Sequence, residues 1–275
     1  MASQKKVSFI GSGRMAEAII AGIVKKKIFS ANRIYIADKD TEKAKILARK
    51  FKVNFCEDNN KALWSGNIIV LAVKPQNMVQ VLEQIKEEIK ASQLVISIAA
   101  GVTIGFLEKA LKGCPVIRAM PNNPCLIGEG MTAVAAGKNA GSSDLKTARD
   151  IFECLGKAIV LKEKYFDAVT GLSGSGPAFV YEFIAALAEG GIKSGLERET
   201  AHQLAVQTIL GSVMTLAETG KSPKELVEMV ASPGGTTIEG LKLFEEAKFS
   251  QIVSDAVYAA AARSKRISAD LGLVC

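Results

Sequence analysis

Short runs of β-forming residues alternate with longer segments of helical spacing between Lys6 and Leu161 of this 275-residue chain. Every position of the run Ile68–Val73 is apolar, which is typical of a strand covered on both faces, as parallel sheets require. The alternation therefore predicts an α/β fold with a doubly wound parallel sheet. The expected strands are Val7–Ile10, Ile34–Ala37, Ile68–Val73, Leu94–Ala99 and Val116–Met120.

The pattern changes after Leu161, where no further run resembles a strand and helical stripes repeat to the C-terminus. We expect an α/β domain over residues 1–162 and an all-helical domain over residues 163–275, joined by a short hinge. The 18 residues between Glu199 and Glu218 carry no charge, a length that approaches a membrane span. Seven of them are polar, so we predict a buried helix of a soluble protein instead.

The helical half carries more continuous apolar surface, including Ala256–Ala262, than one small bundle needs to bury. We therefore expect an obligate oligomer. The alanine run Ala259–Ala262 suits close helix packing or a subunit interface. The high helix propensity of alanine also explains this run without an interface.

Composition excludes several classes of function. Hydrophobic residues make up 48% of the chain and charged residues 23%, which is typical of a globular protein. The net charge of +7 comes from dispersed lysines and aromatic residues are 6%, so we expect no nucleic-acid partner. Five cysteines without a two-residue spacing and the single His202 predict a reduced, cytoplasmic protein with no metal site. The first strand begins at Val7, so we expect no signal peptide and no membrane association.

A glycine-rich turn, Gly11-Ser12-Gly13-Arg14-Met15-Ala16, directly follows the first expected strand and opens the first expected helix. Gly11 permits a tight turn, Gly13 lets the backbone approach a pyrophosphate, and Ala16 allows close packing of helix on strand. The helix N-terminus then offers backbone N–H groups and a partial positive charge to phosphates. This context favours a dinucleotide site, and a glycine-rich turn without a ligand is the alternative.

Asp38 stands at the end of the second expected strand, where a dinucleotide fold often places an acidic residue. Its carboxylate would accept a hydrogen bond from the adenosine ribose 2′-hydroxyl and repel a 2′-phosphate. The position therefore favours NAD over NADP, although Lys39 can partly restore phosphate binding. A solvated loop aspartate is an equally open alternative, because Lys39 and Asp40 follow.

Two further strand ends carry candidate binding residues, Lys74-Pro75 and Ile98–Gly101. Both lie where an open parallel sheet binds its ligand, outside the carboxyl ends of the strands. Alternatively, Lys74 is a solvated strand-end lysine and Pro75 starts a helix at its first position.

Two clusters rich in Gly, Ser and Thr lie in the helical half, at Thr170–Ala178 and Ala231–Ile238, and each precedes a helical stripe. As loops that lead into helix N-termini, they would offer N–H and hydroxyl donors suited to a small carboxylate. A helix cap alone requires one Ser or Thr and not several glycines. The clusters therefore favour a binding site in the second domain.

Four segments together closely resemble the pyrroline-5-carboxylate reductase family: Phe9–Ala16, Leu71–Pro75, Val169–Ala178 and Ser232–Thr237. The resemblance covers essentially the whole chain, and its two C-terminal segments are more specific than the dinucleotide motif. It implies a Rossmann-type domain, a helical dimerisation domain, and homodimers that assemble into larger homo-oligomers. It also implies the last step of proline biosynthesis.

The resemblance further implies NADP and NAD as cofactors and assigns site residues by position. The residues implied at the pyrophosphate are Ile10, Gly11, Ser12, Gly13, Arg14 and Met15. Those implied at the adenosine end are Asp38 and Asn59. Those implied at the nicotinamide half are Ala72, Val73, Lys74, Pro75, Ile98, Ala99 and Ala100. The implied substrate residues are Glu163, Ser232, Gly234, Gly235, Thr236 and Thr237. Two positions depart from the family: Asp38 stands where many members carry a polar or basic residue, and Met229 where an Asn can occur. Asp38 therefore favours use of NADH at least comparable with NADPH.

The implied reaction passes hydride from a reduced nicotinamide to the C=N carbon of 1-pyrroline-5-carboxylate and gives L-proline. A protonated imine is already an electrophile, so the enzyme contributes mainly orientation and a water-poor site. Thr237 is the catalytic candidate, through a hydrogen bond near the ring nitrogen. Alternatively, Thr237 only caps the helix that begins near Ile238.

Two other functions stay open. A hydroxy-acid or other cyclic-imine dehydrogenase of similar build is one, but alcohol oxidation needs a proton-transfer residue, often a lysine in the first helix of the second domain. No Lys or Arg occurs between Lys164 and Lys193. A non-catalytic nucleotide-sensing protein is the other, because a fold does not fix a function.

Overall fold

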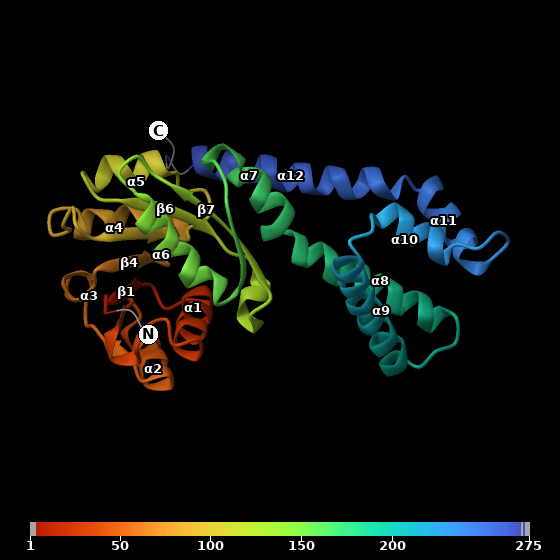
Figure 1. The fold of residues 1–275 in the computed structure, drawn as a ribbon, viewed down its shortest axis with the longest axis horizontal. Coiled ribbons are helices and arrows are strands. Elements are labelled where there is room, and N and C mark those ends of the chain that lie inside the picture. The colour runs from red at the N-terminus through yellow and green to blue at the C-terminus, as the bar shows by residue number, and fades with distance from the viewer. Residues whose placement is uncertain (1–3, 271, 273–275) are drawn as a thin grey trace. The chain divides into compact units, whose positions relative to one another are not determined.

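The structure is a computed structural model that describes residues 4–270 and 272 (Figure 1). The chain divides into two compact units. The sheet unit contains the chain up to residue 175 and from residue 259 onward, and the helical unit contains residues 176–258. The domain limits 1–162 and 163–275 stay a prediction.

One eight-stranded sheet forms the centre of the sheet unit (Figure 1). Its strands in chain order are β1 (Val7–Ile10), β2 (Ile34–Ala37), β3 (Asn54–Phe55), β4 (Ile68–Leu71), β5 (Leu94–Ser97), β6 (Val116–Met120), β7 (Gly130–Ala136) and β8 (Gly156–Val160). Their order in the sheet is β3-β2-β1-β4-β5-β6-β7-β8, and only the pair β6 and β7 is antiparallel. The predicted doubly wound α/β fold is confirmed, with β3, β7 and β8 added to the expected strands.

Two strands end earlier than the apolar pattern predicts. β4 ends at Leu71 and β5 at Ser97, whereas the apolar runs continue to Val73 and Ala99. The residues that follow each strand leave the sheet and line a cavity at its carboxyl edge. Apolar continuity therefore overstates strand length where the residues after a strand both pack against the core and line a cavity.

Helices cover both faces of the sheet (Figure 1). On one face lie α1 (Arg14–Lys25), α2 (Thr41–Phe51) and α6 (Ser142–Glu153). On the other face lie α4 (Met78–Ile85) and α5 (Ile104–Ala110). The sheet unit also contains α3 (Asn59–Ser65), α7 (Phe166–Val169), a π-helix (Thr170–Gly174), the part of α12 (Phe249–Asp270) from residue 259 onward, and short 3-10 segments at Ala31–Arg33, Pro75–Asn77, Asn123–Ile127 and Glu163–Tyr165.

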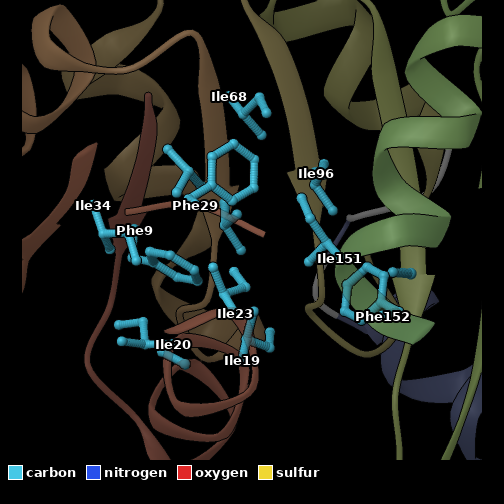
Figure 2. Packing of buried hydrophobic residues seen from close by; sticks show 14 of the residues in the cluster. Phe9, Ile19, Ile20, Ile23, Phe29, Ile34, Ile68, Ile96, Ile151 and Phe152 are labelled. Carbon is cyan, nitrogen blue, oxygen red and sulfur yellow. The ribbon is translucent and has the colours of Figure 1, made fainter. Parts of the chain in front are cut away.

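Alternate strand residues contribute to two separate apolar cores, one on each face. Phe9 of β1 lies in the first core together with Ile19 of α1 and Phe152 of α6 (Figure 2). Its neighbour Ile10 lies in the second core, with residues of α4 and α5. All of these side chains are almost wholly buried. Burial on both faces explains why the strands are apolar at consecutive positions.

No strand follows β8 in the part of the chain that the structure describes. The all-helical character of the C-terminal half is therefore confirmed. Its elements are a π-helix (Thr170–Gly174), α8 (Gly176–Lys193), α9 (Arg198–Thr219), α10 (Pro223–Val230), α11 (Thr236–Glu246) and α12 (Phe249–Asp270).

The helical unit buries little apolar surface of its own. α8 and α9 pack side by side, and the buried hydrophobic residues among those described in this unit are Ala188, Ala201 and Ala205. Three phenylalanine rings, Phe183, Phe244 and Phe249, form a second contact with centroid distances of 4.7 to 6.4 Å.

The burial predicted for the uncharged segment of α9 is wrong for the single chain. Leu204, Leu210 and Val213 are 53%, 51% and 59% exposed. Among the described residues of this unit, the main contact of α9 is with α8, and these three side chains stay exposed. Among the described residues, no helix combines the length and the hydropathy needed to cross a membrane.

Candidate functional site

A cavity of about 1090 Å³ lies at the carboxyl ends of the parallel strands of the sheet unit. Its wall includes the residues that follow β1 and β4, which are neighbours in the sheet although β2 and β3 come between them in the chain. Open α/β sheets bind ligands at such a reversal of strand order. The volume is slightly above the range of about 300–1,000 Å³ that is usual for ligand cavities.

The glycine-rich turn forms the wall of this cavity between β1 and α1. Gly11 has a φ of +108°, and a Cβ there would lie 2.6 Å from the carbonyl oxygen of Ala72. Glycine is therefore required for the close approach of this turn to the end of β4. Gly13 is the N-cap of α1 without a side-chain capping bond, and apart from its neighbours in the chain no described residue has a heavy atom within 4 Å of the place its Cβ would take. Open space and uncapped N–H groups are what an anion needs at a helix N-terminus.

Asp38 holds the glycine-rich turn from the end of β2. Its Oδ2 accepts hydrogen bonds from the backbone N–H of Ser12 (2.5 Å) and from the Ser12 hydroxyl (2.8 Å). Its Oδ1 accepts from the N–H of Asp40 (2.9 Å). Burial alone would raise the pKa of Asp38, but the hydrogen bonds from Asp40 and Ser12 and the charge of Lys43 outweigh burial and lower this pKa. Asp38 is thus an ordered, hydrogen-bonded carboxylate and not a solvated loop residue.

The structure brings fourteen of the fifteen predicted cofactor residues to this cavity. Ser12 does not line it, because its side chain is 3% exposed and contacts Asp38. The fourteen that line it are Ile10, Gly11, Gly13, Arg14, Met15, Asp38, Asn59, Ala72, Val73, Lys74, Pro75, Ile98, Ala99 and Ala100.

One wall of the cavity, at the start of α2, carries residues beyond those that the motifs indicate. Thr41 and Lys43 line it next to Lys39 and Asp40. Asp40 caps α2, because its Oδ1 accepts from the backbone N–H of Lys43 (3.1 Å). An aspartate directly before a helical stripe is the sequence signal for this cap. The adenosine end of the predicted site therefore combines two lysines with two aspartates.

Two adjacent asparagines at the start of α3 line the cavity but differ in their partners. The Asn59 amide donates to Oε1 of Gln84 (2.7 Å). The Oδ1 of Asn60 is buried and has no hydrogen-bond partner in the described part of the chain. A buried acceptor without a partner is costly, so Asn60 joins the predicted Asn59 as a candidate for contact with a ligand.

Glu163, predicted for the substrate, lies just after β8 in the sheet unit. Its Oε1 accepts from Nη1 of Arg118 (2.8 Å) and from the backbone N–H of Ile104 (2.7 Å). Arg118 belongs to β6 and is 4% exposed, and its guanidinium lies 4.8 Å from the ring centre of Phe166. A charged residue inside the apolar run Val116–Met120 signals a buried arginine that needs a partner, but it does not identify Glu163 as that partner.

The predicted substrate loop lies in the helical unit between α10 and α11. Gly234 has a φ of +73°, and the N–H of Gly235 donates to the carbonyl of Ser232 (2.9 Å), so the loop is a tight turn. Gly235 is the N-cap of α11, which begins at Thr236, and no side chain caps this end. Thr237 is therefore not the cap of this helix. The Ser232, Thr236 and Thr237 side chains are exposed, so hydroxyl and N–H donors lie together at this turn.

The other cluster of Gly, Ser and Thr is not a loop, contrary to the prediction. Thr170–Gly174 form a π-helix between α7 and α8, and the N–H of Ser175 donates to the carbonyl of Thr170 (2.8 Å). The cluster therefore continues one helical path and does not begin a helix with free donors. Gly174 lies against β6 here, because a Cβ on it would lie 3.1 Å from the terminal methyl group of Met120. Such π-helical turns are frequent at functional sites.

Comparison with known proteins covers nearly the full chain. A family model described as pyrroline-5-carboxylate reductase dimerisation matches residues 163–267. A pyrroline-5-carboxylate reductase of Methanosarcina acetivorans is 42% identical over 264 residues, which cover 96% of this chain and 98% of that protein. The chain belongs to the pyrroline-5-carboxylate reductase family.

Solved structures of the pyrroline-5-carboxylate reductase family share the fold. The enzyme from Coxiella burnetii has a TM-score of 0.89 at 33% identity, covering 96% of this chain and 98% of that chain. The enzyme from Plasmodium falciparum, solved with NADP bound, has a TM-score of 0.87 at 36% identity, covering 98% and 100%. Residues 6–101 also match a model described as NADP oxidoreductase coenzyme F420-dependent. The likeness thus includes both the cavity and the segment with the turn between α10 and α11.

Proposed function

We propose that this chain reduces 1-pyrroline-5-carboxylate to L-proline with NADPH or NADH, the last step of proline biosynthesis. The observation that carries the proposal is the full-length likeness to pyrroline-5-carboxylate reductases, 42% identical in one relative. The cavity at the carboxyl ends of β1 and β4 supports it, because its turn suits a pyrophosphate.

The cavity residues fit a nicotinamide dinucleotide. The open space at Gly13 and the uncapped N-terminus of α1 suit its pyrophosphate. Asp38 and the asparagines Asn59 and Asn60 are acceptors at the predicted adenosine end. Ala72–Pro75 and Ile98–Ala100 are mostly apolar walls for the nicotinamide half. When bound, the reduced nicotinamide supplies the hydride.

The turn Ser232–Thr237 is proposed to bind the carboxylate of the substrate. Its exposed hydroxyls and the first N–H groups of α11 are suited to a small anion. Thr237 is proposed as the catalytic residue, through a hydrogen bond near the ring nitrogen. Glu163, in the sheet unit, is proposed as a further substrate-binding residue.

Few other side chains are needed for this reaction. A protonated imine is already electrophilic, so the residues orient the ring and exclude water. The single histidine, His202, is exposed on α9, in keeping with a reaction that does not require a histidine base. Absence of Lys and Arg between Lys164 and Lys193 disfavours oxidation of a hydroxy acid.

We further propose that two copies associate through the segment that matches the dimerisation model, residues 163–267. The exposed apolar side chains of α9 support this. Assembly of such dimers into a larger homo-oligomer is the finer proposal. The cysteines Cys56, Cys114, Cys125 and Cys154 are free thiols, which supports a reducing compartment such as the cytoplasm.

One steady-state experiment tests the proposed function. The purified protein is assayed by cofactor absorbance with 1-pyrroline-5-carboxylate and with its six-membered homologue, each with NADH and NADPH. We expect turnover with the five-membered ring at a higher kcat/KM. Absence of turnover with both rings and both cofactors would refute the reductase and favour a nucleotide-sensing protein.

A further inference from the structure

A nearly buried arginine contacts the carboxylate that is proposed to face the substrate. The side chains of Arg118 and Glu163 are 5% and 29% exposed, and their Nη1 and Oε1 atoms are 2.8 Å apart. Arg118 is part of the central sheet and its guanidinium packs on Phe166. The Glu163 carboxylate is therefore paired with a buried guanidinium that the central sheet holds in place.

Stability alone is a poor explanation for this pair. A buried ion pair loses most of its Coulomb energy to desolvation, and an apolar pair of similar volume is often as stable. The surroundings of Arg118 are apolar, with Val116 and Phe166 in the same core. A guanidinium at this place is better explained by its effect on the orientation of the Glu163 carboxylate.

The two hydrogen bonds to Glu163 converge on one oxygen. Oε1 accepts from Arg118 and from the backbone N–H of Ile104. No donor among residues 4–270 and 272 contacts Oε2. A carboxylate held in this way has a fixed plane and one oxygen left for a ligand.

Glu163 is also tied to the wall of the cofactor cavity. Ile98, Ala99 and Ala100 line the cavity, and the same loop ends at Ile104, whose N–H donates to Glu163. The loop is the segment that the family resemblance places beside the nicotinamide half. The fixed carboxylate therefore lies next to the segment that would hold the reacting ring of the cofactor.

We propose that Arg118 is a positioning residue, which fixes Glu163 so that Oε2 accepts the ring N–H of the cyclic iminium substrate. This inference rests on the proposed reduction of 1-pyrroline-5-carboxylate. The positive charge of the iminium disappears as hydride arrives, so a carboxylate partner acts most strongly on the bound substrate. Its loss therefore raises KM more than it lowers kcat.

The test is a double-mutant cycle of Arg118→Lys and Glu163→Gln in the full-length protein. Each single variant is expected to raise KM for 1-pyrroline-5-carboxylate about tenfold, the size of a lost hydrogen bond to a charged group. The dissociation constant of NADPH, from fluorescence titration, is expected to stay unchanged. Adding Arg118→Lys to Glu163→Gln should give no further increase, because Arg118 acts through Glu163.

A matched control is Glu108→Gln on α5. Glu108 is also a partly buried carboxylate with an ion-pair partner, Lys138, and it accepts a backbone N–H, that of Lys138 itself (2.7 Å). Its replacement should leave KM unchanged.

The outcomes separate the two proposals. A wild type that does not turn over the substrate overturns the proposed function. With an active wild type, multiplying effects in the double variant, or a fall in kcat at unchanged KM, overturns the role of Arg118 alone. If Arg118→Lys does not fold, Glu163→Asp is the variant that tests the role of Arg118. The shorter side chain keeps the negative charge but moves the carboxylate away from the Arg118 guanidinium. A tenfold rise in KM for Glu163→Asp supports positioning, and a wild-type KM overturns it.

Discussion

The sheet unit and the helical unit differ in how much apolar surface each buries by itself. The sheet unit packs two apolar cores, one on each face of the sheet. The buried hydrophobic residues described in the helical unit are three alanines. Its larger apolar side chains, such as Leu204, Leu210, Val213 and Met214 of α9, are more than half exposed.

This difference separates the two places to which we assign parts of one proposed function. The cavity proposed for the cofactor belongs to a unit that has its own apolar cores. The turn Ser232–Thr237 belongs to a unit that exposes many large apolar side chains, and large exposed apolar patches commonly mark interaction surfaces. Such a unit needs a second surface, and the match of residues 163–267 to a dimerisation family supports a second copy as that surface.

Charges on α9 should have the largest effect. Leu210 and Val213 are three residues apart and therefore share one face of the helix. The double variant Leu210→Lys with Val213→Lys would place unpaired cations in a subunit contact, at a cost of several kcal/mol per buried charge. We expect sedimentation velocity to show loss of the oligomer.

The control for α9 is Ile46→Lys with Val79→Lys in the sheet unit. These two side chains are 63% and 49% exposed, so the added charge and the lost apolar area are similar. The control should sediment like the wild type. A wild type that is a stable, active monomer would contradict the comparison between the units.

Truncation in the sheet core should have the next largest effect. Phe9→Ala removes a fully buried ring from the first core, which costs about 3–5 kcal/mol of unfolding free energy. Phe244→Ala in the helical unit removes a ring that is 40% exposed and should cost less. Urea unfolding at several protein concentrations separates these costs from assembly. Equal costs would mean that the helical unit has a core of its own.

Thr237→Val tests the turn of the helical unit. The variant is nearly isosteric and lacks the hydroxyl, and a lost hydrogen bond to a charged group costs about 1.5–3 kcal/mol. We expect turnover to fall roughly tenfold to somewhat over a hundredfold, with cofactor binding unchanged. Single-turnover hydride transfer and melting temperature are measured on one preparation. A lower melting temperature with an unchanged transfer rate would refute the catalytic role, and a change confined to KM would mean equal binding of substrate and transition state.

The strands of the sheet were predictable wherever burial on both faces selects apolar residues. β1, β2 and β6 have the predicted limits. β3 consists of two residues, too few for a pattern. β7 is rich in Gly and Ala, which have low β-propensity, and it is a strand because it pairs with β6 and β8. The local sequence pattern of a segment does not show which strands it pairs with in the sheet.

The cavity proposed for the cofactor was predictable because many of its residues directly follow strands. Arg118 and Glu163 were not predicted as a pair, because 45 positions separate them and only the fold brings them together. The π-helix at Thr170–Gly174 was predicted as a loop, because its glycines resemble a turn, whereas Gly174 lies in a helical path close to the Met120 side chain. Glycine content alone does not distinguish a loop from tight packing.

Asp38→Ser tests whether the sheet unit alone sets the choice of cofactor. The Asp38 carboxylate would repel the 2′-phosphate, whereas Lys39 and Lys43 line the same wall. We expect the wild type to use NADH at least comparably with NADPH. The variant should shift the ratio of kcat/KM values toward NADPH by about tenfold, or about 1.4 kcal/mol. An unchanged ratio would mean that Asp38 only holds the glycine-rich turn.

The smallest expected effect is the pH dependence of stability at Asp38. Hydrogen bonds from Ser12 and Asp40 outweigh burial and lower the pKa of Asp38 below its ordinary value of 3.8. A carboxyl whose pKa is lowered on folding stabilises the native state above its unfolded pKa, and this contribution disappears as the pH falls through the folded pKa. In the wild type, Ser12 and Asp40 donate hydrogen bonds to the two carboxylate oxygens of Asp38. Asp38→Asn replaces one of these oxygens with an N–H₂ group, which cannot accept them. The melting temperature of the variant should therefore be below that of the wild type at pH 7. The difference should be nearly constant from pH 7 down to about pH 5 and shrink at lower pH. Calorimetry of both proteins from pH 7 to pH 3 measures it, and a difference that grows on acidification would contradict the charged, hydrogen-bonded role of Asp38 in the sheet unit.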